Sequence, residues 1–102
     1  MKKFKVIVSQ KTLDMLKEHI AFIANVDRKA ARKAKNKLID AFQSLEEMPQ
    51  RYPFFNEKYI PSNKYHKMYV EKWYLVLYQI KDDTVYIDFV LDCRKDYTWL
   101  IK

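Results

Sequence analysis

The sequence predicts an α+β domain in which an N-terminal strand and an antiparallel helical hairpin pack on an antiparallel sheet completed by a three-stranded C-terminal meander. Three observations carry this prediction. A short β-branched segment, 4–8, opens the chain, and two segments of helical periodicity follow it. From residue 65 onward the apolar pattern changes to short strand-like runs. This order of elements is typical of a sheet with a helical hairpin on one face.

The first predicted helix follows the opening strand directly. Ser9 is a suitable N-cap, because a serine side chain can accept a hydrogen bond from the first helical turn. Asn25 is a reasonable end for this helix. Its apolar residues recur at helical spacing, at Leu13, Leu16, Ile20 and Ile23.

The second predicted helix has Asp27 as its N-cap and Pro49 as its end. Only a few residues separate the two helices, so they should be antiparallel neighbours. Small residues at the start of the apolar stripe would allow a close approach. The stripe comprises Ala31, Ala34, Leu38, Phe42 and Leu45, and Ala30 and Ala41 widen it.

Residues 49–64 contain all three prolines and should form a loop. We expect Tyr52, Phe54 and Phe55 to anchor this loop to the core. Strands are predicted at 65–70, 73–80 and 85–91, with hairpin turns at 71–72 and 81–84. The chain has no glycine, so Asn, Asp and Pro should make the turns. The lack of glycine also excludes phosphate-binding glycine loops.

Length and composition indicate one globular domain covering residues 1–102, with 49% hydrophobic and 16% aromatic residues. No apolar run is long enough to cross a membrane, and no apolar segment of a signal peptide follows Met1. The single cysteine, Cys93, cannot form an internal disulfide. We therefore expect a cytoplasmic protein that has no membrane partner.

The charge is strongly basic, with 20 Lys and Arg against 13 Asp and Glu, which gives a net charge of +7. Such a surface attracts polyanions or acidic proteins, although it can also serve solubility alone. The second helix concentrates the charge, because no acid interrupts residues 28–37. This run could follow a phosphate backbone, receive an acidic protein segment, or be a solvated face. Candidate nucleic-acid contacts are Arg28, Arg32, Lys35 and Lys64.

The C-terminal third carries a pattern that resembles a known family. Residues 66–70 read HKMYV, residues 73–80 read WYLVLYQI, and residues 84–90 read TVYIDFV. A basic, acidic and aromatic tail follows at 92–97, DCRKDY, and residues 45–53 read LEEMPQRYP. Together these segments resemble the RelE/ParE toxin superfamily, which comprises toxins of type II toxin–antitoxin systems and plasmid stabilization proteins. The resemblance covers nearly the whole chain.

The resemblance implies a toxin that an acidic cognate antitoxin neutralises. RelE-like members cleave mRNA in the ribosome, whereas ParE-like members poison DNA gyrase and are not nucleases. Neither activity implies a cofactor, and no spacing of metal ligands occurs in the sequence. A homodimer formed through an exposed sheet edge or through the apolar end of the helical hairpin is a further expectation.

RNA cleavage of the RelE type requires a group that activates the 2′-hydroxyl, cations that stabilise the phosphate and an acid that protonates the leaving oxygen. Each candidate also has a structural interpretation. His66 could be a buried strand residue, Arg94 and Lys95 could be paired with neighbouring acids, and Tyr97 could pack beside Trp99. His19 is interpreted as a solvated helix residue. The candidate catalytic residues are Arg94, Lys67, His66, Lys95 and Tyr97.

Two departures from the RelE pattern weaken the nuclease hypothesis. Leu75 stands where ribosome-dependent members often have an arginine, and Tyr69 stands where a second lysine is expected. The clustering of basic residues near the ends of the meander still favours ribosome-dependent mRNA cleavage by a narrow margin. The alternatives are a ParE-like gyrase inhibitor that acts by protein binding, and a diverged relative that is not toxic.

Overall fold

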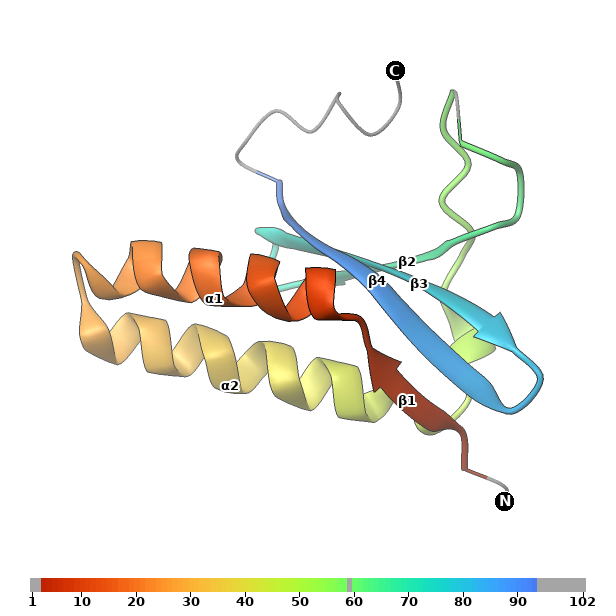
Figure 1. Cartoon of the computed structure of the whole chain (residues 1–102), viewed down its shortest axis with the longest axis horizontal. Coiled ribbons are helices and arrows are strands. Elements are labelled where there is room, and N and C mark those ends of the chain that lie inside the picture. The colour runs from red at the N-terminus through yellow and green to blue at the C-terminus, as the bar shows by residue number, and fades with distance from the viewer. Residues whose placement is uncertain (1–2, 59, 94–102) are drawn as a thin grey trace.

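The computed structural model describes residues 3–58 and 60–93. The chain folds in the predicted order of elements, with a helical hairpin on one side of a twisted sheet (Figure 1). The elements are β1 (Lys5–Val8), α1 (Gln10–Ala24), α2 (Arg28–Ser44), the short 3₁₀ helix η1 (Pro49–Arg51), β2 (His66–Val70), β3 (Tyr74–Lys81) and β4 (Thr84–Asp92). Most strand ends differ from the predicted ranges by one residue, and the other ends agree.

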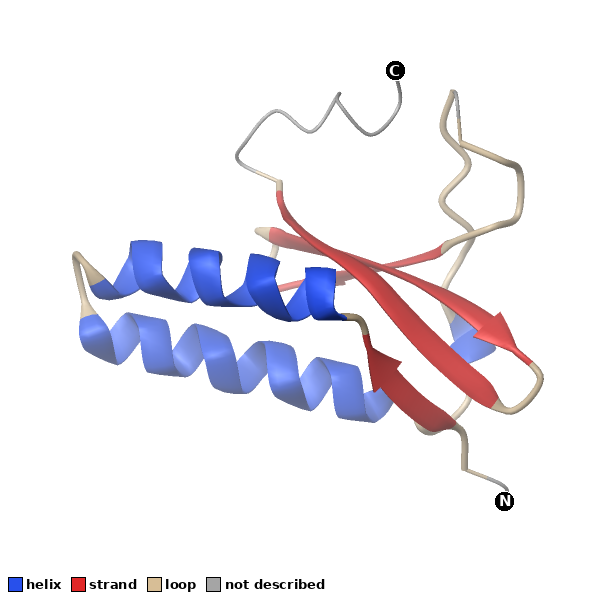
Figure 2. Ribbon diagram, viewed as in Figure 1, coloured by secondary structure: helices blue, strands red, loops and turns tan. Residues whose placement is uncertain are grey.

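The four strands form one sheet in the order β1-β4-β3-β2. The C-terminal meander is antiparallel, as predicted, and β1 joins the sheet in parallel with β4, where Val6 lies opposite Val85. Two parallel strands require a long crossover connection between them, and the helical hairpin forms the first part of this connection. Figure 2 shows both helices on the same side of the sheet. The prediction of a hairpin covering one face is therefore confirmed.

α1 begins at the predicted cap and closes the exposed edge of β4. The Ser9 hydroxyl accepts a hydrogen bond from the Thr12 amide at 3.0 Å. At the end of β1, the Ile87 carbonyl accepts hydrogen bonds from the Ser9 amide and from the Thr12 hydroxyl, each at 3.0 Å. Further along β4, His19 Nε2 donates to the Val90 carbonyl at 3.0 Å. A side chain of α1 thus bonds β4 beyond the residues that pair with β1. His19 is half-buried against Tyr74, so the interpretation of a solvated histidine is wrong.

α2 begins at Asp27 as predicted, because the Asp27 carboxylate accepts hydrogen bonds from two backbone amides of the first turn. It ends at Ser44, before the expected end at Pro49. The guanidinium of Arg51 folds back and donates to the carbonyls of Ser44, Glu47 and Met48. These bonds satisfy carbonyl groups that the helix end leaves without intrahelical partners.

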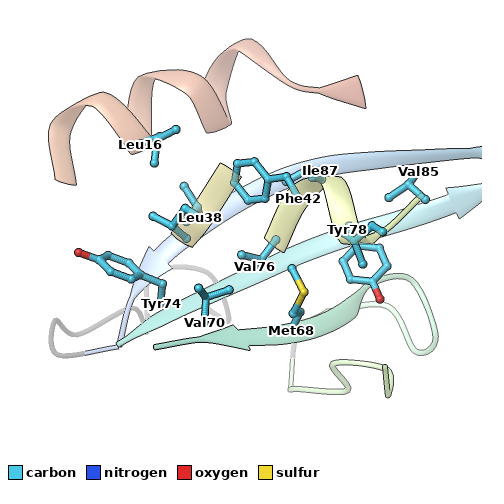
Figure 3. Packing of buried hydrophobic residues seen from close by; sticks show 12 residues of the cluster. Leu16, Leu38, Phe42, Met68, Val70, Tyr74, Val76, Tyr78, Val85 and Ile87 are labelled. Carbon is cyan, nitrogen blue, oxygen red and sulfur yellow. The ribbon is translucent and has the colours of Figure 1, made fainter. Parts of the chain in front are cut away.

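The core has two parts, one on each face of the sheet. The larger part lies between the sheet and the helices, where Leu38 and Phe42 of the predicted stripe pack on Val76 and Ile87 (Figure 3). Leu45 of the same stripe belongs to this part of the core. The smaller part lies on the opposite face, where Phe55 from the loop covers buried residues of β3 and β4, Leu75, Leu77 and Leu91. Ala30 is exposed, contrary to the prediction that it widens the stripe.

The loop between η1 and β2 is attached at several points to the strand edge. Phe55 is buried, Tyr52 packs against the larger core, and Phe54 is partly exposed while its ring lies on that of His66. The Lys67 amide donates to the Pro53 carbonyl at 2.9 Å. The predicted anchoring to the core is therefore confirmed for Tyr52 and Phe55, whereas Phe54 is 40% exposed and contacts the strand through His66.

The turns do not follow the simple rule expected for a chain without glycine. Asn63 and Asp82 have a positive φ, in agreement with the prediction, but so do Met48, Glu71 and Lys72. A Cβ atom makes this region of backbone conformation unfavourable, and glycine avoids that cost. The β2–β3 turn therefore contains two consecutive residues, Glu71 and Lys72, in a conformation that neither prefers.

Candidate functional site: the open sheet face and the groove between the helices

The face of the sheet that points away from the helices carries one predicted catalytic residue. In β2, Lys67 and Tyr69 lie opposite Leu77 and Leu75, whose side chains belong to the smaller core. Because residues directly opposite each other on paired strands point to the same face, Lys67 lies on this open face. It is half-buried there. Lys67 is thus placed where a cation could meet a ligand lying across the sheet.

His66, its neighbour in sequence, lies on the other face and in the core. It is 8% exposed, and its ring stacks on Tyr78 with centroids 5.3 Å apart and lies 4.2 Å from the Phe54 centroid. Its Nδ1 atom is 2.7 Å from the Tyr52 carbonyl, which can only accept, so Nδ1 carries the proton. These contacts correspond to the structural interpretation of His66. The strand does not bring His66 and Lys67 together.

The remaining predicted catalytic residues, Arg94, Lys95 and Tyr97, lie outside the described residues. The described chain ends at Cys93, whose amide donates to the Trp73 carbonyl at 2.6 Å. Burial raises the pKa of the Cys93 thiol, and the nearby Asp92 carboxylate raises it further. A raised pKa disfavours the reactive thiolate, which agrees with a bystander thiol.

The open face carries aromatic rings, each with a lysine over it. Tyr65 and Phe89 meet edge to face with centroids 5.9 Å apart, and Lys11 lies 4.7 Å from the Phe89 centroid. Lys64, a predicted nucleic-acid contact, is exposed and lies 5.3 Å from the Tyr65 centroid. Burial, and then the negative charge of Asp88, raise the pKa of Tyr65. Asp88 also accepts a hydrogen bond from Gln79 at 2.6 Å.

The described residues of the open face are therefore poorly suited to phosphate chemistry. Asp88 places a negative charge, which would repel a phosphate, among the lysines of this face, and the Tyr65 phenol is harder to ionise than a free one. Within residues 3–58 and 60–93, no cluster of three or more metal-ligating side chains occurs. In the same part of the chain, no helix is long and apolar enough to cross a membrane.

An apolar groove of about 640 Å³ lies between α1, α2 and β1. Leu13, one of the apolar residues at helical spacing in the first predicted helix, is 37% exposed and lines this groove. The groove is not predictable from periodicity, because its apolar residues fall on the same helical stripes as the core. The other lining residues are mainly apolar and include Val6, Val8, Leu16, Ile20, Ala21, Ile39 and Phe42.

The rim of the groove is charged. Lys17 on α1 and Lys35 on α2 line it, and Glu46 lies after the end of α2. Arg28 and Arg32 lie at positions seven and three residues before Lys35, so helical geometry places them on the same side of α2. Three predicted nucleic-acid contacts, Arg28, Arg32 and Lys35, thus share the groove side of the helix. All three are exposed.

Sequence reasoning missed two residues that the structure makes important for the fold. His19 follows Leu16 by three positions and precedes Ile23 by four, so the helical spacing already placed it on the buried side of α1. Arg51 gave no comparable signal, because its role depends on the loop turning back on α2. Its guanidinium also lies 4.7 Å from the centroid of Tyr52.

Comparisons with known proteins agree with this architecture. The sequence profile of the family described as "ParE toxin of type II toxin-antitoxin system, parDE" matches residues 6–97. A solved structure titled "Chromosomal ParDE TA system from P. aeruginosa" contains a similar chain, with a TM-score of 0.71 and 11% sequence identity. The similarity covers 90% of this chain and 98% of that one. No protein with a curated description matches the chain. The profile match extends from the first strand past the last, and the chain therefore belongs to the ParE toxin family of type II toxin–antitoxin systems.

Proposed function

We propose that this toxin arrests growth by binding DNA gyrase and not by cleaving RNA. The observation that carries the proposal is the separation of His66 from Lys67. A nuclease of the RelE type needs a proton-transfer group beside its phosphate-binding cations. Here His66 is held in the core by Tyr52, Phe54 and Tyr78, while Lys67 lies on the opposite face.

Two further features support a toxin that acts through protein contacts. The open face gathers aromatic rings, which are enriched in protein interfaces, and its lysines are accompanied by the Asp88 carboxylate, which would repel a phosphate backbone. The resemblance described above associates ParE-like toxins with gyrase. The proposal joins this association to the geometry of the described residues.

A supercoiling assay tests the proposal directly. Purified toxin is added to gyrase, ATP and relaxed plasmid, and we expect supercoiling to fall with increasing toxin. The control is a type I topoisomerase relaxation assay under the same conditions, in which the toxin should have no effect. Undiminished supercoiling at toxin concentrations well above that of gyrase would disprove the proposal.

Ribosome-dependent mRNA cleavage remains the second candidate, and the position of Lys67 favours it. Lys67 is half-buried on the open face, and Arg94 and Lys95 follow the last strand in sequence. This function predicts new mRNA 5′ ends by primer extension when toxin meets translating ribosomes. It also predicts that Lys67→Ala lowers the cleavage rate while leaving the folded state intact.

We further propose that the cognate antitoxin binds in the groove between α1 and α2. The floor of the groove is apolar, and Lys17 and Lys35 stand at its rim. An amphipathic segment with an acidic edge matches both properties, since its apolar side would fill the floor and its carboxylates would meet the lysines. The type II family places such a protein partner beside the toxin.

A pair of matched substitutions tests this docking. Ala21 lines the groove, whereas its neighbour Phe22 is 61% exposed and does not line it. We expect Ala21→Glu to weaken binding to the product of the adjacent antitoxin gene at least about 100-fold, because the glutamate would be buried in an apolar interface. Phe22→Glu introduces the same charge one residue away and should change the affinity less than about tenfold. Equal affinities for both variants would place the antitoxin elsewhere.

A further inference from the structure

The basic residues of α2 form two separate stripes. With 3.6 residues per turn, Arg28, Arg32 and Lys35 share the side of the helix that faces the groove. The remaining three, Lys29, Lys33 and Lys37, are spaced four residues apart and follow a different side of the helix. Two of these three, Lys33 and Lys37, line a separate pocket of about 310 Å³ between α2 and the β2–β3 turn. We call Lys29, Lys33 and Lys37 the lysine stripe.

We propose that the lysine stripe binds the phosphate backbone of duplex DNA. All three side chains are exposed. At 1.5 Å of rise per residue, positions four apart are about 6 Å apart along the helix, so three ammonium groups lie in a short row. No acid occurs between residues 28 and 37, and Asp40 lies beyond the end of the row. Such a row matches a chain of regularly spaced negative charges.

The positive charge of the lysine stripe is little neutralised by acidic side chains of the protein. Among the described residues it makes one ion pair, between Lys37 Nζ and Glu71 Oε1 at 3.6 Å. Both side chains of this pair are about half exposed, with values of 51% and 50%. An exposed pair of this kind contributes little, so Lys37 can exchange Glu71 for a phosphate at small cost.

A polyanion fits this side of α2 better than a second acidic protein does. The centre of a protein interface is apolar and depleted in lysine. The large apolar groove lies on the other side of the helix, with the arginines and Lys35. The lysine stripe instead borders a smaller mixed pocket where Glu71 and Trp73 stand beside Lys33 and Lys37. A row of lysines without a large apolar floor suits a phosphate backbone, which binds through charge alone.

DNA contact goes beyond the proposed action on gyrase, and it would assist that action because gyrase holds duplex DNA. The two proposals are tested separately. DNA binding is measured with toxin and DNA alone, whereas gyrase inhibition is measured by supercoiling. A toxin that binds DNA without affecting gyrase would support the lysine stripe proposal and contradict the gyrase proposal. A toxin that inhibits gyrase but does not bind DNA would support the gyrase proposal and contradict the lysine stripe proposal.

The first test is the salt dependence of binding to a fluorescent duplex of about 20 base pairs, measured by anisotropy between about 50 and 200 mM salt. Three phosphate contacts predict that the slope of log K against log salt becomes about 2.7 less steep in the variant Lys29→Gln, Lys33→Gln, Lys37→Gln. At the lowest salt we expect this variant to bind at least about tenfold more weakly. The control variant Lys5→Gln, Lys11→Gln, Lys81→Gln loses the same net charge from other elements and should retain the steeper slope.

The second test places the DNA on the surface. The chain has two tryptophans, so in a Trp99→Phe background all tryptophan emission comes from Trp73, which lines the pocket with Lys33 and Lys37. Duplex DNA should change the Trp73 emission with the same midpoint as the anisotropy. Equal losses in the two triple variants would overturn the proposal, as would an unchanged Trp73 emission. Equally tight binding of poly-glutamate, with the same dependence on the lysine stripe, would assign the stripe to an acidic protein instead.

Discussion

His66 Nδ1 lies 2.7 Å from the main-chain oxygen of Tyr52, which fixes the histidine of β2 to the loop that precedes it. The ring is also stacked on Tyr78 and covered by Phe54. One side chain thereby connects the loop after η1 to the central strand of the meander. A histidine that resembles a catalytic residue in the sequence is therefore part of the structural framework.

This relationship predicts that His66→Phe lowers the stability of the protein and leaves its toxicity intact. The phenyl ring can keep the stacking on Tyr78 and Phe54, but the Tyr52 carbonyl loses its donor. We expect a loss of about 1–3 kcal/mol in the free energy of unfolding, measured by urea denaturation. Growth arrest should persist when toxin abundance is matched by immunoblotting. A variant that is as stable as the parent but harmless would show that His66 acts in the toxic reaction.

The fold was largely predictable because its signals are local. Ser9 and Asp27 were identified as caps from residue type and position, and the switch from helical to alternating periodicity located the meander. The end of α2 was missed because it depends on Arg51, seven residues beyond Ser44, folding back onto the helix. A nonlocal hydrogen bond of this kind leaves no mark on local propensity or periodicity.

The site was less predictable than the fold. Alternation along β2 already placed His66 and Lys67 on opposite faces, but only the packing of Phe54 and Tyr78 shows which face is the core. The groove could not be predicted, because Leu13 falls on the same helical stripe as the core residue Leu16. Whether an apolar side chain faces a core or a groove depends on what lies opposite it, which periodicity does not contain.

Tyr78 predicts an alkaline limit to stability. Its hydroxyl donates to the Pro49 carbonyl at 2.7 Å in the core, and burial raises the pKa of this phenol far above its ordinary value. The unfolded chain therefore loses this proton first, at about pH 10. The contribution of Tyr78 to stability is complete below that pH and falls as the pH rises further.

The test compares Tyr78→Phe with the parent from pH 8 to about pH 11 by thermal unfolding. At pH 8 the variant should be less stable by about 1–2 kcal/mol, because the Pro49 carbonyl is left without its donor. Above pH 10 the difference between the two proteins should become smaller. A difference that stays constant across this range would contradict the assignment of a raised pKa to Tyr78.

The β2–β3 turn predicts a stabilising substitution. Glu71 and Lys72 have φ values of 53° and 65°, a region that glycine occupies without a steric penalty. We expect Lys72→Gly to raise the free energy of unfolding by about 0.5–1 kcal/mol, measured in urea. The matched control is Lys58→Gly, outside the positive-φ positions, which should not be stabilising. A destabilised Lys72→Gly protein would contradict the described turn conformation.

The central claim, that the toxin acts on gyrase, is tested most directly in cells that carry the toxin gene under an inducible promoter. One induced culture is divided, and the two halves are assayed for DNA covalently attached to gyrase and for new mRNA 5′ ends. We predict that gyrase-linked DNA breaks accumulate before growth stops and that no new mRNA ends appear at ribosome-bound codons. Abundant new mRNA ends without gyrase-linked breaks would contradict the account.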